Sequence, residues 1–435
     1  MKWLAGAILL LVFAILFGLD LLAYAMYVLL AVMLVSRFLT RNWAESLAAT
    51  RECNRLSAEI GDQVAVVIAL KNNSRWPVAW VLLEDLLPRE ALMFDPPRLK
   101  IGGRRVQITM LRGSARKTML YQVTPTKRGY YQLGPLVLET GDLFGLHRRY
   151  RVLTEPHFLL VLPKVLPLAG YEVASKRPIG EVRMTYRLYE DPTRIAGVRA
   201  YERGDALNRV HWRATARTGT LHSKVYEPST VAGATLLMEF HVAAHEKKDE
   251  PHRSELAVTA AASIANAVYL MNQQVGLVTN GRDAADRVRH EGWAHDHRSR
   301  AEALASATVR DKSDRLQPLI VPTRRGPEQI VRILETLARV ELTDGLPLPA
   351  LIEEAASRMP RDATVIAILP PGSSESAVAL GNLRHRGYAV TVLLNMHDEW
   401  DFATAAAPFL AEGIDTRQLK DETSIMEICR GLALR

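Results

Sequence analysis

The sequence predicts a multi-domain protein with an N-terminal transmembrane helical hairpin, an antiparallel β-sandwich-like domain and a C-terminal α/β doubly wound domain. Three patterns indicate this fold class: a long apolar run at the start, short alternating strands over residues 51–165, and strands that alternate with helices over 231–435. The length of 435 residues is enough for two or three domains with cores of their own.

The apolar run covers residues 3–35 and contains a single charge, Asp20. One straight helix of this length would span about 50 Å, whereas the hydrocarbon core of a bilayer is ~30 Å thick. Gly18 and Asp20 therefore predict a turn between two helices, 4–17 and 21–35, which form a transmembrane hairpin over 1–36. A juxtamembrane helix is expected over 37–50. A signal peptide cleaved after "AYA" (residues 23–25) is the alternative, but a second apolar run follows it directly.

The flanking charges predict the topology of the hairpin. Lys2 precedes it, Arg37, Arg41, Arg51 and Arg55 follow it, and its turn has no basic residue. Because basic residues stay on the cytoplasmic side, both ends and the soluble domains are expected in the cytoplasm, with a periplasmic location as the alternative.

Positive charge is concentrated in one region. Residues 97–151 hold twelve Lys and Arg against Glu139 and Asp142, an excess larger than the net charge of +8. A basic face suits nucleic acid or anionic lipid. The hairpin favours membrane lipid, and we expect no nucleic acid. Cys53 and Cys429 form no CxxC pair, which argues against a disulfide framework.

Residues 51–165 predict the sandwich-like domain. Apolar residues nearly alternate, and Gly, Pro, Asn or Asp interrupts the pattern every ten or so positions. The predicted strand segments are 62–74, 76–88, 105–112, 117–129, 130–142 and 157–163.

Residues 231–435 predict a mostly parallel sheet. Strands at 234–240, 275–280, 363–370 and 388–395 alternate with helices. We expect Ser254 to cap one helix and Pro327 to begin another. A charged insertion, 282–317, interrupts the pattern.

The segment 166–230 links the two soluble domains and contains a predicted helix. Asp205 is its expected N-cap and Gly219 ends it. Trp212 is expected in a core, and three arginines share one stripe: Arg209, Arg213 and Arg217. They could bind an anion, or they could fasten the domains by pairing with nearby acids. No catalytic partner is visible, which favours the second reading. The acids are Glu190, Asp191, Glu202 and Asp205.

The stretch "VRAYERGDALNRVHWRATARTGTLHSKVYE" resembles the hallmark of the domain-of-unknown-function 58 family. The matching residues are Arg199, Tyr201, Gly204, Asp205, Arg209, Trp212, Ala216, Arg217 and Gly219. "KRGYYQLGPLVLETGDLFGLHRR" is similar to an upstream segment of the same proteins. The resemblance implies a bacterial inner-membrane protein with a von Willebrand A-like C-terminal domain. It also implies a MoxR-type AAA+ ATPase as partner, together with transglutaminase-like or other von Willebrand A proteins.

The family comparison also bears on metal binding. A metal-binding von Willebrand A domain carries D-x-S-x-S after its first strand, whereas this chain has Glu239, His241 and Ala243 at those positions. A hard cation needs several oxygen ligands, so we predict a degenerate site that binds no metal. No GxGxxG or P-loop pattern occurs, and no cofactor is expected.

Two functions remain open at this point. The first is a non-catalytic, membrane-anchored adaptor or scaffold that works with a MoxR-type ATPase in assembly or chaperone-like activity on envelope or other protein complexes. The second is a hydrolase or transferase that uses the Arg/His/Trp stretch. The second needs a nucleophile in contact with a base, and the neighbours His222 and Ser223 point to opposite faces of a predicted strand.

Overall fold

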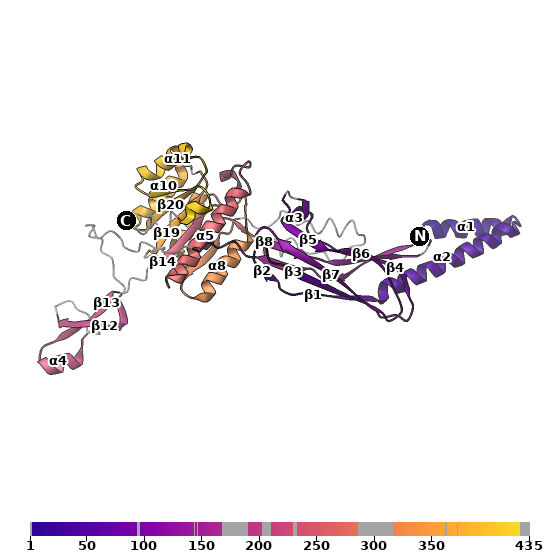
Figure 1. Cartoon of the computed structure of the whole chain (residues 1–435), viewed down its shortest axis with the longest axis horizontal. Coiled ribbons are helices and arrows are strands. Elements are labelled where there is room, and N and C mark those ends of the chain that lie inside the picture. Colours follow the sequence, from indigo (N-terminus) through magenta and orange to yellow (C-terminus); the bar gives the residue numbers. More distant parts are fainter. Residues whose placement is uncertain are drawn as a thin grey trace. The chain divides into compact units, whose positions relative to one another are not determined.

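A computed structural model describes residues 2–93, 96–142, 144–145, 147–167, 190–201, 210–228, 233–285, 316–361, 363–371 and 373–426 (Figure 1). The chain divides into two compact units. The first comprises Met1–Lys164, Arg282–Arg315 and Leu334–Leu342. The second comprises Val165–Gly281, Leu316–Ile333 and Thr343–Arg435.

The first unit begins with a helical hairpin. α1 (Lys2–Leu16) and α2 (Asp20–Ser46) are joined at Gly18, whose φ of 64° suits glycine. Ala7 and Ala14 are buried, because their small side chains let the two helices approach closely. Among helices of the described residues, α2 alone is long and apolar enough to cross a membrane, and α1 is a shorter apolar helix.

The separate juxtamembrane helix expected over 37–50 was wrong. Residues 37–46 continue α2, because no Gly or Pro lies between Val35 and Ser46 to break it. Leu47 then begins a strand.

Antiparallel sheets follow, as predicted. The strands form the sheets β1-β3-β7-β5, β10-β9-β4-β6 and β2-β11-β8, with β2–β11 the parallel pair. Their bounds are β1 (Leu47–Cys53), β2 (Ser57–Ala58), β3 (Val64–Asn72), β4 (Val78–Asp85), β5 (Leu99–Gly103), β6 (Val106–Leu111), β7 (Arg116–Pro125), β8 (Gly129–Leu133), β9 (Leu136–Gly141), β10 (Arg148–Thr154) and β11 (His157–Val161), with a short helix α3 (Arg89–Met93) after β4.

The end of α2 is part of the core of these sheets. Trp43, Ala44 and Leu47 pack in one cluster with strand residues such as Leu70. Arg151 donates from one guanidinium nitrogen to the carbonyls of Ala44 (3.0 Å), Glu45 (3.2 Å) and Leu47 (3.1 Å). Carbonyls at a helix C-terminus lack intrahelical partners, and a cation there is favourable. The apolar helix is therefore fixed to the sheets.

A buried ion pair joins strands of different sheets. Arg51 of β1 donates to both carboxylate oxygens of Asp85 on β4, and both side chains are fully buried. The Tyr121 hydroxyl donates to the same carboxylate at 2.6 Å. Arg51 also donates to the carbonyls of Leu133 (3.1 Å) and Glu155 (2.8 Å). These bonds offset the desolvation of the two charges.

We predict that Gly134→Ala strongly destabilises the first unit. Gly134 has a φ of 91°, and an added Cβ would overlap the Arg51 guanidinium. Gly61 is a matched control, with a φ of 93° and open space around it. Gly61→Ala should cost about 1–2 kcal/mol of unfolding free energy for the left-handed backbone. Gly134→Ala should cost about 3–5 kcal/mol more if the ion pair breaks. Urea unfolding measures both, and equal losses would contradict the prediction.

The second unit is built on a six-stranded sheet in the order β17-β15-β14-β19-β20-β21 (Figure 1). All neighbours are parallel except β15 and β17, which are antiparallel. The bounds are β14 (Gly233–Met238), α5 (His252–Leu270), β15 (Gln274–Thr279), β17 (Leu319–Arg324), α8 (Pro327–Arg339), α9 (Leu348–Ala355), β19 (Thr364–Leu369), α10 (Ser374–His385), β20 (Ala389–Asn395), α11 (Glu399–Ala411) and β21 (Asp415–Leu419), with single turns η2 (Val242–Ala244) and η3 (Ala356–Arg358).

This sheet confirms the predicted mostly parallel α/β content. With β14 as the first strand, the order is the doubly wound 3-2-1-4-5-6. One core packs α9, α10 and α11 against buried strand residues such as Leu237, Ala367 and Leu394. Pro327 begins α8, as predicted.

Two predicted boundaries need correction. α5 begins at His252, so Ser254 is not its N-cap but lies in its first turn, where its hydroxyl donates to Glu250. The first two residues of the predicted charged insertion belong to a strand, because β16 (Arg282–Asp283) pairs with β18 (Val340–Glu341). Residues 286–315 of that insertion lie outside the described residues.

Candidate functional site

The hallmark segment forms a small β-α-β element in the second unit. β12 (Glu190–Ala200) pairs with β13 (His222–Pro228), and α4 (Trp212–Thr218) lies between them in sequence. The His211 ring accepts a hydrogen bond from the Ala214 N–H at 3.0 Å and so caps α4. Gly219, at a φ of 71°, ends α4 as predicted.

The predicted start of this helix was wrong. Val210 bridges Ser223 in extended pairing, and the backbone N–H of His211 donates to the carbonyl of His222 at 2.8 Å. These backbone bonds hold residue 210 beside β13, so the helix begins only at Trp212. Three hallmark residues lie outside the described residues: Gly204, Asp205 and Arg209.

Trp212 is not in a core, which corrects the sequence prediction. Its side chain is 69% exposed, and Arg213 and Arg217 beside it are exposed too. Neither arginine forms an ion pair with a side chain that the structure describes. Arg199 is also exposed and donates to the carbonyl of Ala200 at 3.2 Å, and the N–H of Tyr201 donates to the carbonyl of Leu221 at 2.9 Å. We call Trp212, Arg213 and Arg217 the α4 surface.

The catalytic alternative depends on contact between His222 and Ser223. Both residues lie on β13, where successive side chains point to opposite faces of the strand. Ser223 is buried, whereas the His222 ring contacts the Thr218 hydroxyl (3.2 Å) and the Thr220 carbonyl (2.8 Å). Within residues 210–228, the imidazole is therefore engaged away from the serine.

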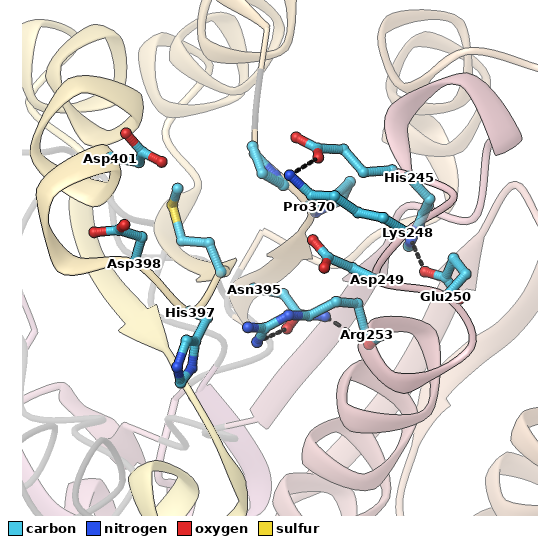
Figure 2. A pocket seen from close by; sticks show the side chains of 13 residues that line it. His245, Lys248, Asp249, Glu250, Arg253, Pro370, Asn395, His397, Asp398 and Asp401 are labelled. Atoms are coloured by element: carbon cyan, nitrogen blue, oxygen red, sulfur yellow. Dashed lines mark hydrogen bonds and ion pairs between the residues drawn. The ribbon is translucent and has the colours of Figure 1, made fainter.

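A second candidate site is a pocket of about 250 Å³ at the carboxyl edge of the sheet. Ligands bind at this edge in doubly wound folds, where the strand order reverses. Figure 2 shows Asp398 and Asp401 on one side and Lys248, Asp249 and Arg253 on the other. Five carboxyl groups line it, against the cations Lys248 and Arg253; the acids are Glu246, Asp249, Glu250, Asp398 and Asp401.

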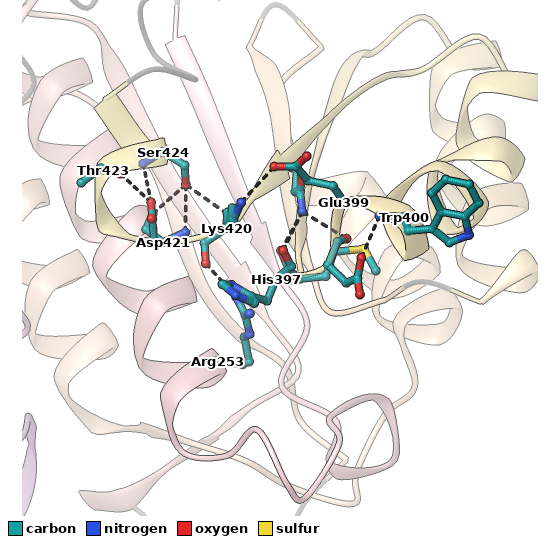
Figure 3. A network of polar contacts seen from close by, with 11 residues as sticks. Arg253, His397, Glu399, Trp400, Lys420, Asp421, Thr423 and Ser424 are labelled. Carbon is teal, nitrogen blue, oxygen red and sulfur yellow. Dashed lines mark hydrogen bonds and ion pairs between the residues drawn. The ribbon is translucent and has the colours of Figure 1, made fainter.

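A network of polar contacts continues from two residues of the pocket lining, Arg253 and His397 (Figure 3). Arg253 donates to the carbonyl of Lys420 at 3.0 Å, and Lys420 pairs with Glu399 at 2.9 Å. Asp398 caps α11 by accepting from the Trp400 N–H at 2.8 Å. The Trp400 ring points away from this network and is 87% exposed.

The positions of the degenerate metal site lie next to the pocket but do not converge. Glu239 is buried, the His241 ring accepts from the Ala243 N–H at 3.2 Å, and Ala243 itself is exposed. Among the described residues, no three His, Cys, Asp or Glu side chains are grouped to hold one metal ion. Absence of a metal and of a cofactor stays a prediction.

Comparisons with known proteins address the hallmark. The model of the family described as protein of unknown function DUF58 matches residues 197–314. The uncharacterized protein YeaD of Bacillus subtilis is 25% identical over 314 residues, which cover 71% of this chain and 75% of YeaD. Both matches support the DUF58 family that the hallmark resemblance indicated.

Solved structures show only weak likeness to this chain. It is similar to the CARDB domain of a Pyrococcus furiosus protein at 14% identity, over 26% of this chain and 91% of that domain, with a TM-score of 0.17. It is also similar to proximal thread matrix protein 1 of the mussel byssus, at 9% identity over 46% of this chain and 48% of that protein, with a TM-score of 0.29. Both TM-scores are too low to establish a shared fold.

Two buried titratable groups lie at the pocket, Glu239 and His245. Burial raises the pKa of Glu239 to about 7, although the charge of His245 opposes this. Burial alone would lower the pKa of His245, but hydrogen bonds to the Glu250 carboxylate (2.7 Å) and the Glu239 carbonyl (3.0 Å) raise it. The sequence placed Glu239 near this edge, but it gave no signal that Asn395, Asp398 and Asp401 complete the pocket.

Glu239 predicts a pH dependence of stability. Its folded pKa of about 7 exceeds its usual 4.5, so the unfolded chain loses this proton first. The free energy of unfolding therefore falls between about pH 4.5 and 7, by about 3 kcal/mol from this group. Glu239→Gln cannot ionise and should be more stable than the wild type at pH 8, by up to that amount, and equally stable near pH 4.5.

Urea unfolding at the two pH values measures this difference. Glu246→Gln is the control, because Glu246 is exposed in the same loop and pairs with Lys248. A Glu239→Gln protein with no added stability at pH 8 would refute the assignment.

Proposed function

We propose that this DUF58 protein is a membrane-anchored, non-catalytic adaptor or scaffold whose α4 surface binds a partner protein. The single observation that carries the proposal is the exposed Trp212 next to the exposed Arg213 and Arg217, on a helix that the fold caps at both ends. The hallmark resemblance suggests a MoxR-type AAA+ ATPase as the partner, in assembly or chaperone-like work on protein complexes.

The chemistry of the α4 surface fits protein binding. Trp and Arg are enriched among the residues that dominate binding energy at protein interfaces. The His211 cap and the Gly219 turn fix α4 before any partner arrives, so little ordering entropy is lost on binding.

The described geometry gives less support to a hydrolase or transferase. Such an enzyme needs a nucleophile, a base and a stabilising group in mutual reach. His222 and Ser223 are the pair that this stretch offers, and their side chains lie on different faces of β13.

The second unit is, in this proposal, a von Willebrand A-like domain that no longer needs a metal. Its doubly wound strand order supports this. So does the position of Glu239, His241 and Ala243 directly after the first strand, where a metal-binding domain of that kind has D-x-S-x-S.

The proposal includes an anchor of two transmembrane helices in the bacterial inner membrane, with both soluble units in the cytoplasm. α2 has the length and apolar character of a span, and α1 lies against it as a shorter apolar helix. Thinning of the bilayer, or helix pairing, accommodates a short span. The excess of basic residues over 97–151 would face anionic lipid, although the exposed ones lie on strands of two sheets, for example Lys100 on β5 and Arg149 on β10.

Trp212→Ala should weaken partner binding at least about 30-fold without loss of stability. Surface substitutions change the free energy of unfolding by about 0.5 kcal/mol or less, whereas loss of a hot-spot Trp costs 2 kcal/mol or more, roughly a 30-fold weaker Kd. Binding of the full chain in detergent to the purified MoxR-type ATPase of the same organism tests this. Trp400→Ala is the matched control, because Trp400 is an exposed Trp of the same unit. If both variants bind like wild type, the α4 surface is not the docking site.

The topology gives a separate prediction. Protease added to intact spheroplasts should leave the soluble units uncut, and the same protease added after lysis should digest them. The reason is that basic residues, Lys2 and Arg37, lie at the two ends of the hairpin, whereas its turn contains Asp20 and no basic residue. Digestion from outside would show a periplasmic location instead.

A further inference from the structure

The first unit contains an apolar groove where α2 leaves its apolar stretch. Residues 31–43 of α2 and the loop residues Asp142 and Phe144 enclose about 250 Å³. Apart from Ser36 and Asp142, every lining side chain is apolar. We call this space the juxtamembrane groove.

The two polar side chains of the groove satisfy one another. The Ser36 hydroxyl donates to the Asp142 carboxylate, which also accepts from the His147 N–H at 3.2 Å. This contact ties the loop to α2 and leaves the remaining walls apolar.

Trp43 is different, because its polar group has no partner. Its side chain lines the groove and is only 7% exposed, and its buried Nε1–H makes no hydrogen bond in the described part of the chain. An unpaired buried donor is unfavourable by about 1–3 kcal/mol, so an occupant that brings an oxygen acceptor would be stabilised there.

The position of the groove along α2 indicates which occupant fits. Twenty residues from Asp20 span about 30 Å, so the hydrocarbon boundary falls near Leu39, close enough for the Arg37 side chain to extend its charge to the headgroups. Ala31 and Val35 then lie at acyl-chain depth, and Trp43 lies one turn further, in the layer of ester and phosphate oxygens where Trp is enriched. Phe144, 71% exposed, stands at the same rim.

We propose that the juxtamembrane groove holds one bilayer phospholipid, with an acyl chain along Ala31 and Val35 and a lipid oxygen accepting from Trp43 Nε1–H. The proposal rests on the membrane anchoring proposed above. It does not depend on the partner of α4.

Native mass spectrometry of the full chain, extracted from nanodiscs of phosphatidylethanolamine and phosphatidylglycerol, tests the occupant. Val35→Trp fills the groove. Leu34→Trp is the matched control, because Leu34 and Val35 are both 57% exposed and only Val35 lines the groove. Wild type and Leu34→Trp should retain one phospholipid, and Val35→Trp should retain at least tenfold less. Equal lipid retention by the two variants would overturn the proposal. The proposal would also be overturned if the mass spectrum showed a bound peptide in place of the phospholipid.

A second measurement does not depend on the folding of Val35→Trp. Phospholipids brominated on the acyl chain should quench a fluorescence component that wild type has and Trp43→Phe lacks. Trp43→Phe should also retain lipid about two- to tenfold less well, because one hydrogen bond is lost. Identical quenching in the two proteins would overturn the assignment. Vesicle flotation separates the two proposals: a chain that does not float overturns the anchor as well, whereas a floating chain with equal retention overturns the groove alone.

Discussion

The buried pair of Arg51 and Asp85 is the contact on which the first unit depends. Arg51 belongs to β1, Asp85 to β4 of another sheet, and the carbonyl of Leu133 to β8 of a third. Two buried charges are tolerated only when every donor and lone pair is used, and the Tyr121 hydroxyl contributes to that. One side chain thus specifies how three sheets meet, which apolar packing alone leaves less defined. β1 also follows α2 directly, so the same contact fixes the strand that carries the anchor.

The two candidate sites of the second unit have different physical origins. The α4 surface is local, since its cap, helix and terminating glycine lie within nine residues, His211 to Gly219. The pocket is topological, because parallel strands bring Glu250 and Asp401 to one edge across about 150 residues of chain. The α4 surface offers exposed side chains that a partner can contact. The pocket, in contrast, has an opening lined by acidic side chains, with the buried titratable groups Glu239 and His245 next to it.

Much of the fold could be predicted because the burial of one face of a strand or helix makes apolar residues recur at a regular spacing in the sequence. Val64, Val66, Ile68 and Leu70 alternate on β3, and Gly18 marked the hairpin. The failures have equally physical causes. His211 is not among the usual N-cap residues, and helical periodicity cannot show that the Trp212 face has no core to enter. β21, "DTRQL", is a polar edge strand without an apolar pattern. In the sequence, Arg51 of β1 is indistinguishable from a solvent-exposed arginine, because its partner Asp85 lies 34 residues away.

The unbroken course of α2 has a mechanical consequence. The helix runs from Asp20 to Ser46 without a Gly or Pro, and its last turn is held in the core of the sheets. Such a helix has no hinge, so it acts as a lever arm. A helix adjusts its tilt to the thickness of the bilayer that surrounds it. With α2 as the proposed membrane anchor, any change of that tilt must rotate the sheets as a body relative to the membrane plane, which makes bilayer thickness a determinant of the orientation of this unit.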